Sequence, residues 1–518
     1  MVLKLSIVLC FFISLADAQV TLQPWVEVFG TVNQQQLGVY VLGIVPSANL
    51  PFRAAVSTHP NEPNSGITRF YRLNSPTDTA SQLILSGENP LIGDLNNDGF
   101  KDVVIGKSVS GYDTVYIYWG TSTGIDTLNP LRIPGENQFD GLLPATIGDI
   151  NNDGHEDLIL AARRYPNFPI YGKIYIFLSP IATSNPSVTI TGDSVYAGLG
   201  WAASIGDLNN DGLNDLIVRG VNQVLPLQNR YDYVNIYFGV GIDTVNTRLG
   251  LHMRTKFLAL GGLACFDVNG DGKSDLLWTT ADSAGQYVNV HFGRTNFQTN
   301  PDVRLVPPFF VGDFGFALAD AGDMNGDGYH DLIMGSPFAS SAAGIVIEYS
   351  GGPRIDPYFD AAVAKDFDGY FGQSVATVGD INGDGLSDII VGAPRYAFLA
   401  DKGYWGIFKG DSAIRVTDVP QPLAFPTEFE LHDAYPNPFN PVTRIEFGLR
   451  TSAHVTIDVV DLLGRQVRTL VDENYSIGEH STEFDGSGLA SGTYYYRMTV
   501  KKNGGIAFQQ TKGLTLLK

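Results

Sequence analysis

A nine-residue acidic motif in this sequence has the spacing of a loop that wraps around a hard cation. Asp380, Asn382, Asp384 and Asp388 stand at positions one, three, five and nine, and Gly385 stands at position six. Calcium takes six to eight oxygen ligands in flexible geometry, and calcium loops supply them from alternate residues together with the backbone carbonyl at position seven. The motif therefore predicts a calcium site.

The motif occurs six times at a nearly constant interval. Its copies begin at Asp94, Asp149, Asp207, Asp267, Asp323 and Asp380. Successive first aspartates are 55, 58, 60, 56 and 57 residues apart. A repeat of this length is typical of a propeller or of another array of similar units.

Every copy offers the same set of oxygen ligands, so up to six Ca²⁺ ions are expected. The alternative is a polar hairpin without metal, but three carboxylates within nine residues repel one another unless a cation lies among them. The predicted ligands, counting the backbone carbonyl at position seven, are Asp94, Asn96, Asp98, Phe100, Asp102, Asp149, Asn151, Asp153, His155, Asp157, Asp207, Asn209, Asp211, Leu213, Asp215, Asp267, Asn269, Asp271, Lys273, Asp275, Asp323, Asn325, Asp327, Tyr329, Asp331, Asp380, Asn382, Asp384, Leu386 and Asp388.

The residues around the motif indicate strands rather than helices. A helix–loop–helix site of the EF-hand type needs an acid at position twelve, where this chain has Ile105, Leu160, Val218, Trp278, Met334 and Val391. Alternating runs such as 115–119 and 234–238 follow in the repeats and predict strands. Dockerin-type repeats fail on the same ground, because no helix is indicated. The repeats therefore predict an all-β fold in which each loop joins two strands.

The charge of the chain excludes one class of partner. The net charge is −21, and nucleic-acid binding needs Lys and Arg to neutralise phosphates. The ligand positions of the six loops account for 18 of the 54 acidic residues. Six bound divalent cations would reduce the net charge to about −9, so the acidity has a local explanation.

The N-terminal region contains two further predicted segments. Residues 1–18 have the features of a secretory signal peptide, with Lys4, an apolar stretch over 5–15 and a small-residue end. No later stretch is long enough to cross a membrane. Cys265 is then the single cysteine of the mature chain, and we expect it in the core. Residues 19–87 have strand composition and are interpreted as a degenerate seventh unit, with an unrelated leader strand as the alternative.

The last two repeats carry a family resemblance. Phe371 and Gly372 precede the loop at 380–388, and Gly392–Pro394 follows it; Phe314–Gly315 and Gly335–Pro337 frame the preceding loop in the same way. This pattern resembles the FG-GAP repeat of integrin α-subunit propellers. The resemblance implies a seven-bladed β-propeller over residues 19–413, with calcium loops between the first two strands of a blade. Integrin ligand specificity does not carry over.

The C-terminal region differs from the repeats. A proline-rich linker is expected over 414–430, and a small β-sandwich over 431–518. The start at 435–441, Asp461–Arg465, Gly492–Tyr494 and the end at 512–518 resemble the type A sorting domain of the type IX secretion system. The resemblance implies that the secretion machinery recognises this domain and exports the protein to the outside or the outer cell surface of a Gram-negative bacterium. The alternative is an ordinary adhesion sandwich.

No catalytic residues are predicted. The histidines lack zinc-ligand spacing, and neither a nucleophile elbow nor a phosphate-binding glycine loop occurs. We therefore expect a binding or adhesion protein with a protein or glycan as its surface ligand. The segments Arg163–Tyr171, Gly220–Asp232 and Pro394–Tyr404 carry aromatic rings that either contact this ligand or simply pack the loops.

Two alternatives to the binding function remain open. One is a secreted carbohydrate-active enzyme, a polysaccharide lyase or hydrolase, on the same scaffold, which rests on analogy between folds. The other is a passive spacer for surface display. A cluster of Arg, Lys or His beside an acid would favour the enzyme.

Overall fold

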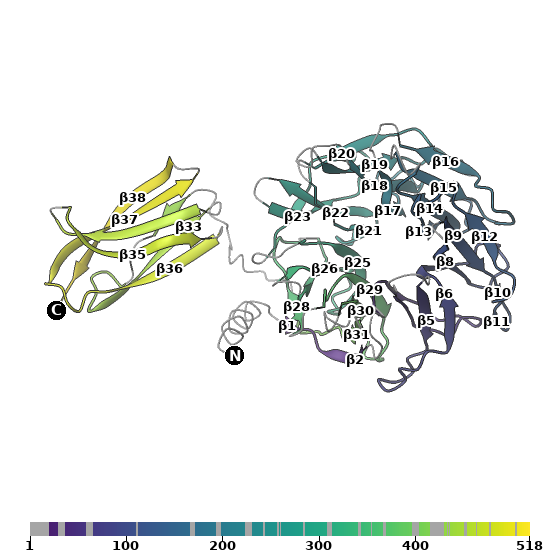
Figure 1. Ribbon diagram of the computed structural model, residues 1–518, viewed down its shortest axis with the longest axis horizontal. Helices are drawn as coiled ribbons and strands as arrows, with labels where there is room; N and C mark the ends of the chain where they lie inside the picture. Colours follow the sequence, from purple (N-terminus) through teal and green to yellow (C-terminus); the bar gives the residue numbers. More distant parts are fainter. Residues whose placement is uncertain are drawn as a thin grey trace. The chain divides into compact units, whose positions relative to one another are not determined.

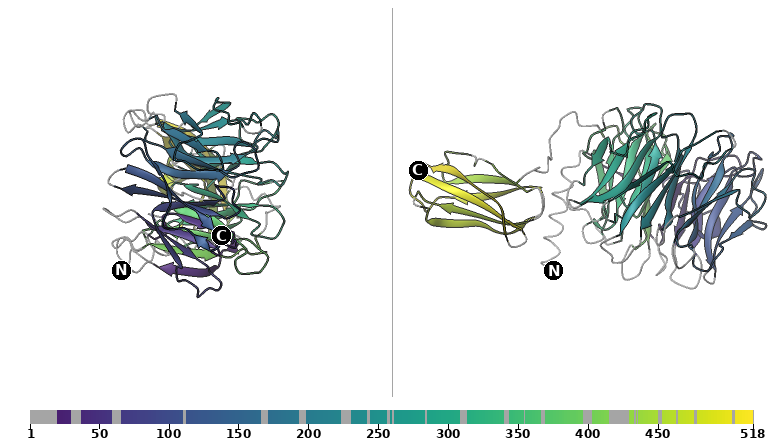
Figure 2. Two further views of the ribbon diagram at one scale, coloured as in Figure 1. Left: turned by 90° about the vertical axis from the view of Figure 1, so that its right-hand side faces the viewer. Right: turned by 90° about the horizontal axis from the view of Figure 1, so that it is seen from above.

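A computed structural model of the chain divides into two compact units, Met1–Val416 and Thr417–Lys518, and each is described by itself (Figures 1 and 2). The structure describes residues 20–29, 37–58, 66–109, 112–165, 171–192, 198–222, 230–241, 244–255, 258–259, 261–282, 285–307, 313–339, 343–353, 355–365, 369–395, 403–414, 429–432, 434, 436–449, 453–462, 464–475, 478–502 and 505–517. The expected signal peptide and most of the expected linker lie outside these residues. Every element in the described residues is a β-strand, which confirms the all-β class.

Among the described residues, the first unit contains seven sheets of four or five strands, which we number in chain order, and one separate two-stranded hairpin. Sheet one is β3 (Val41–Gly43), β4 (Ala54–Thr58), β5 (Ile67–Tyr71) and β6 (Leu83–Ser86). Sheet two is β7 (Glu88–Gly93), β8 (Asp102–Val109), β9 (Tyr112–Tyr118) and β12 (Leu131–Pro134), with the short hairpin β10 (Gly120–Thr121) and β11 (Gly124–Ile125) between the last two. Sheet three is β13 (Leu142–Gly148), β14 (Asp157–Ala162), β15 (Lys173–Phe177) and β16 (Val188–Thr191).

The remaining four sheets repeat the same antiparallel order. Sheet four is β17 (Leu199–Gly206), β18 (Asp215–Asn222), β19 (Tyr231–Tyr237) and β20 (Leu251–Arg254). Sheet five is β21 (Leu263–Phe266), β22 (Asp275–Asp282), β23 (Gly285–His291) and β24 (Val303–Leu305). Sheet six is β25 (Ala317–Gly322), β26 (Asp331–Ser336), β27 (Ile345–Tyr349) and β28 (Ala361–Ala364), and sheet seven begins with β29 (Ser374–Gly379), β30 (Asp388–Ala393) and β31 (Tyr404–Phe408).

The first strands of the seven sheets follow one another in space as they do in the chain. Contacts join β3 to β7, then β13, β17, β21, β25 and β29, and β29 also contacts β3 (Figure 1). Apolar side chains fill the space between neighbouring sheets. One such cluster contains Leu277 and Val290 of sheet five together with Leu332 and Ile347 of sheet six. The core of this unit is therefore divided into layers between sheets.

The N-terminal strands complete the last two sheets rather than the first one. Strand β2 (Pro24–Phe29) pairs antiparallel with β31 and is the fourth strand of sheet seven. Strand β1 (Val20–Thr21) pairs parallel with β28 of sheet six. The interpretation of residues 19–87 as one repeat unit therefore needs a correction, since only 41–86 form sheet one. Pairing between strands 377 residues apart leaves no periodic signal in the sequence.

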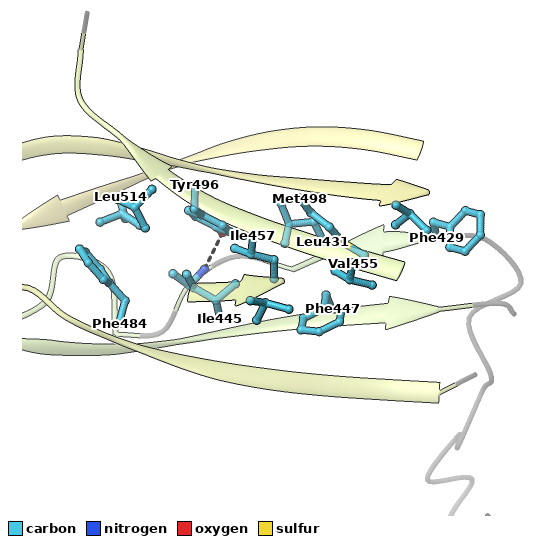
Figure 3. Packing of buried hydrophobic residues seen from close by; sticks show 14 of the residues in the cluster. Phe429, Leu431, Ile445, Phe447, Val455, Ile457, Phe484, Tyr496, Met498 and Leu514 are labelled. Carbon is cyan, nitrogen blue, oxygen red and sulfur yellow. Dashed lines mark hydrogen bonds between the residues drawn. The ribbon is translucent and has the colours of Figure 1, made fainter. Parts of the chain in front are cut away.

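The second unit consists of two packed sheets. One contains β32 (Glu430–Leu431), β33 (Val442–Leu449) and β36 (Gly478–Asp485), and the other contains β35 (Gln466–Tyr475), β34 (Ala453–Val460), β37 (Gly492–Lys502) and β38 (Gly505–Leu516). Figure 3 shows Phe447, Ile457 and Met498 filling the space between them. The buried hydroxyl of Tyr496 accepts a 3.0 Å hydrogen bond from the Ala434 N–H and donates one of 2.7 Å to the carbonyl of His432. This arrangement is a β-sandwich.

Within the part of the chain that the structure describes, there is no helix of the length and apolarity needed to cross a membrane.

Candidate metal centres

Each acidic loop occupies the same place in its sheet. The loop follows the first strand, and its ninth residue is the first residue of the second strand: β7 ends at Gly93 and β8 begins at Asp102, and β29 ends at Gly379 and β30 begins at Asp388. The second residue of each loop lies under it, with exposed fractions from 0% at Leu95 to 8% at Ile381. Six equivalent loops are thus held on buried apolar residues.

The oxygen-bearing side chains of each loop fold inward onto its own backbone. In the loop of sheet two, Asp94 accepts hydrogen bonds from the N–H groups of Asp98 (3.1 Å) and Gly99 (2.9 Å). Asn96 Oδ1 also accepts from Asp98 N–H at 3.1 Å, and Asp98 Oδ1 accepts from Phe100 N–H at 2.9 Å. The other five loops repeat these four bonds at 2.7–3.3 Å.

Two positions of the loop need a left-handed backbone. The glycine at position six has a φ of +83° at Gly99 and +88° at Gly385, a conformation that side chains disfavour. Position four also has a positive φ, and it is Asn in sheets two to four and Gly in sheets five to seven, for example Asn97 (61°) and Gly383 (81°). Sequence reasoning missed this second position, although its restriction to Asn and Gly is a readable signal.

The aspartate at position nine fastens the loop to the rest of its sheet. Oδ2 of Asp102 accepts the Leu95 N–H at 2.8 Å, and Oδ1 accepts the Gly120 N–H beyond the third strand at 2.6 Å. The same pair of bonds occurs at Asp157, Asp215, Asp275, Asp331 and Asp388. All six side chains are fully buried. The predicted ligand at position nine therefore also has a structural role in the absence of any ion.

Burial sets the protonation of these aspartates. It raises the pKa of Asp102, Asp157 and Asp388 to about 6. It raises the pKa of Asp215, Asp275 and Asp331 to about 7. The backbone N–H donors oppose this shift, because they favour the charged form.

The eighth position links neighbouring loops in the first unit. Glu156, which precedes Asp157, accepts a 2.6 Å bond from the backbone N–H of Asp94 in the preceding loop and pairs with Lys101 at 2.8 Å. Asn214 donates to the carbonyl of Asp149 at 2.7 Å. The loops of sheets two, three and four are thus connected in series, a relationship that spacing alone does not reveal.

The donor chemistry fits a hard cation, although the assembled centre is a prediction. Each loop supplies carboxylate, amide and carbonyl oxygens, the ligands that calcium prefers, and carboxylate oxygens have lone pairs beyond those used by N–H donors. Among the described residues, however, no three acidic, His or Cys side chains are gathered closely enough to hold a metal ion. One loop differs, because Lys273 Nζ lies 2.7 Å from Asp271 Oδ2 and would compete with an ion.

The aromatic residues proposed as ligand contacts fall into three groups. Tyr404 is fully buried in the core, which corrects its interpretation as a surface contact. Tyr165, Tyr171 and Tyr231 are partly exposed. Phe168, Tyr396 and Phe398 lie outside the described residues.

A cavity that sequence reasoning did not anticipate lies between sheets four and five. Its volume is about 360 Å³. Its lining includes His252 and Arg254 of β20, Asp282 of β22 and Arg304 of β24. A gap between two strands of different repeats depends on side-chain size on both, so no motif marks it.

The fold and the loops together define a class: an all-β repeat protein with acidic hairpin loops, followed by a β-sandwich. Comparison with protein families identifies both parts. The FG-GAP-like repeat matches residues 94–160 and 149–218, and the FG-GAP repeat matches 316–349 and 371–404. The Secretion system C-terminal sorting domain matches 433–507. The chain is therefore an FG-GAP repeat protein with a C-terminal sorting domain, and that domain indicates export to the outside or the surface of the cell.

Three curated relatives match about a third of this chain or slightly more. Integrin alpha pat-2 of Caenorhabditis briggsae is 31% identical over 38% of this chain and 18% of its own length. Phosphatidylinositol-glycan-specific phospholipase D of Rattus norvegicus is 30% identical over 33% of this chain and 22% of its own length. Integrin alpha-5 of Xenopus laevis is 29% identical over 38% and 20%. The matched region is thus about a fifth of each of these relatives.

Proposed function

We propose that this protein is a calcium-stabilised, seven-bladed β-propeller that binds a protein or glycan at the outer surface of a Gram-negative bacterium. One observation carries the proposal: six loops with the same inward-facing oxygen atoms occupy the same junction in six of seven sheets whose first strands contact in series. The sorting domain supplies the route of export through the type IX machinery.

Calcium has a structural role in this proposal. The side chains at positions one, three, five and nine and the carbonyl at position seven would hold the ion, for example Asp323, Asn325, Asp327, Asp331 and Tyr329. A bound cation offsets the repulsion among three carboxylates and stabilises the folded state by its binding free energy. The loop backbone needs little rearrangement, since its hydrogen bonds already turn these side chains inward.

Thermal melts with and without chelation test the calcium proposal. The full chain is melted in EDTA and in excess Ca²⁺, and isothermal titration of the EDTA-treated protein counts the sites. We expect calcium to raise the melting temperature strongly, because up to six sites contribute. Equal melts in both conditions would contradict the proposal.

Export is tested separately by deleting residues 429–518 in the native host. We expect the truncated protein to stay inside the cell envelope, whereas the full chain reaches the culture medium or the outer surface. Normal export of the truncated chain would remove the assigned role of the sorting domain.

The cavity between sheets four and five favours a second candidate, a carbohydrate-active enzyme. Its lining includes His252, Arg254 and Arg304 together with Asp282, and a basic group beside an acid is the kind of arrangement that would serve catalysis. Asp282 is the single acid in this lining, however, and glycoside hydrolases use a pair of carboxyl groups. We therefore favour binding over hydrolysis. Incubation with polyuronates, followed by assays for unsaturated and reducing ends, tests both lyase and hydrolase activity.

A further inference from the structure

The cavity between sheets four and five contains a buried polar atom without a partner. Asn289 on β23 is 8% exposed and lines the cavity. Its Oδ1 accepts no hydrogen bond from any described residue. Buried acceptors are nearly always satisfied, so an unpaired one on a residue that lines a cavity is a candidate contact for a bound group.

Asn289 is smaller than the equivalent residue of two other sheets. Asn289 pairs across the sheet with Trp278, the residue at position twelve of its repeat. In sheets two and three the residue that pairs with position twelve is Tyr116 or Tyr175. The equivalent residue is Asn235 in sheet four, Ile347 in sheet six and Gly406 in sheet seven. A tyrosine is larger than an asparagine, so Asn289 leaves more space beside Trp278 than the tyrosine of sheets two and three would.

The neighbouring sheet shows how an asparagine at this position is normally satisfied. Asn235 occupies it in sheet four, and its Oδ1 lies 2.8 Å from Nδ1 of His252 on the adjacent β20. Asn289 faces Arg304 in the same register on β24. Arg304 instead stacks on Tyr287, 4.5 Å from the ring centroid. Asn289 Oδ1 therefore receives no hydrogen bond from Arg304.

The wall beside Asn289 is held in place by its own contacts. Trp278 Nε1 donates a 3.2 Å hydrogen bond to Nε2 of the buried His291. Asp282 accepts a hydrogen bond from the Tyr287 hydroxyl and pairs with Arg304 at 3.4 Å. These contacts occupy Asp282 and fix the rings that form the wall.

The lining is cationic in a strongly acidic chain. Two arginines face one aspartate there, whereas the chain has a net charge of −21. Arg254 is exposed and lies over the Tyr231 ring, 5.5 Å from its centroid. No described carboxylate forms an ion pair with it. Arg254 is thus available to a negatively charged ligand, and Asn289 Oδ1 lacks a hydrogen-bond donor.

We propose that this cavity binds a uronate residue of an acidic glycan, with a sugar hydroxyl donating to Asn289 and the carboxylate facing Arg254. The proposal names a ligand class for the binding function proposed above and rests on it. A ligand that combines hydroxyl donors with one carboxylate satisfies both groups, whereas a neutral sugar leaves Arg254 without a charge partner and a simple carboxylate leaves Asn289 without a donor. The volume of about 360 Å³ is in the usual range for small ligands.

Titration calorimetry on the full chain in calcium tests this assignment with D-galacturonate, D-galactose and acetate as probes. We expect galacturonate to bind at least about tenfold more tightly than either control, because it alone meets both groups. Asn289→Tyr, which places in sheet five the residue of sheets two and three, should abolish galacturonate binding. Arg254→Glu, a change on the exposed rim, should do the same while leaving the melt unchanged.

Arg132→Ala is the matched control, since Arg132 on β12 has the register that Arg304 has on β24. Its galacturonate affinity should equal that of the unchanged protein. Equal binding of galactose and galacturonate, or undiminished binding by both Asn289→Tyr and Arg254→Glu, would overturn the assignment. Failure of all three probes would also overturn it, yet surface binding and the calcium-dependent melt would still report on the proposed function independently.

Discussion

Oδ1 of Asp215 accepts a 2.8 Å hydrogen bond from the backbone N–H of Gly239, which lies 24 residues later and beyond the third strand of the same sheet. Oδ2 of the same carboxylate accepts the N–H of Leu208 at 2.9 Å. One buried side chain thus joins three segments of a sheet, and the equivalent aspartate does so in five other sheets. The acidic loop is therefore part of the sheet's framework as well as a candidate metal centre.

This dual role predicts different behaviour for two aspartates of one loop. Asp215→Asn should lower the free energy of unfolding by about 1–3 kcal/mol in both EDTA and calcium, because the amide turns an N–H toward a buried N–H donor. Asp211→Asn should be harmful only in calcium, since Asp211 is exposed. Urea unfolding above pH 7, where the Asp215 carboxyl is ionised, measures both effects. Equal losses in the two conditions for Asp211→Asn would contradict the separation of roles.

The same aspartates predict a pH dependence for the metal-free protein. Burial raises the pKa of Asp102 to about 6 and that of Asp331 to about 7, above the ordinary 3.8. Between the unfolded pKa of 3.8 and the folded pKa of each aspartate, the folded state therefore binds more protons than the unfolded state. The free energy of unfolding falls as the pH rises through this range. His291 has the opposite effect: burial lowers its pKa, so its contribution to stability increases as the pH rises.

Melting temperatures in EDTA at a series of pH values check this prediction. The contribution is complete below the unfolded value of 3.8 and is lost as the pH rises past about 7. Calcium should flatten the decline, because a bound cation favours the ionised carboxylate. A melting temperature that increases with pH in EDTA between 6 and 7 would refute the assignment.

The N-terminal segment should be essential to the first unit. Leu22 is 1% exposed and packs in the cluster that contains Phe371 and Phe408. Leu22→Ala should therefore cost about 2–5 kcal/mol, the usual effect of a cavity in a core. Leu128, at 86% exposure, is the matched control, and its change to Ala should stay within about 0.5 kcal/mol. Denaturant unfolding compares the two, and equal losses would show that the N-terminal segment does not pack there.

The hydroxyl of Tyr496 should stabilise the second unit alone. Tyr496→Phe removes the acceptor of the Ala434 N–H and the donor to the His432 carbonyl, and we expect a loss of about 1–3 kcal/mol. Tyr495→Phe is the control, because this neighbour is 37% exposed. Hydrogen exchange of residues 429–517 measures the effect. Increased exchange in the first unit would mean that the effect is not local.

Periodic features of the chain could be predicted without coordinates. Glycine at position six, the acids at positions one, five and nine and the apolar residue at position twelve recur in every copy, and each depends only on its immediate neighbours. Position nine was identified in the same way, but its bonds to Gly120 or Gly239 were not, since they join residues far apart in the chain. The buried Tyr404 was misassigned because an aromatic near a loop looks alike whether it faces solvent or the core.

The sequence by itself determined the repeat, the strand-flanked acidic loops, the all-β class and the sorting domain, because these follow from local spacing and from motifs that are contiguous in the chain. Only the tertiary structure decided that β2 completes sheet seven, that Glu156 reaches back to the preceding loop, and that Asn289 and Arg254 line one cavity. Each of these depends on which surfaces meet when separate repeats pack together. Contacts between repeats are set by side-chain size and register on both partners, and neither is encoded in the spacing of one repeat.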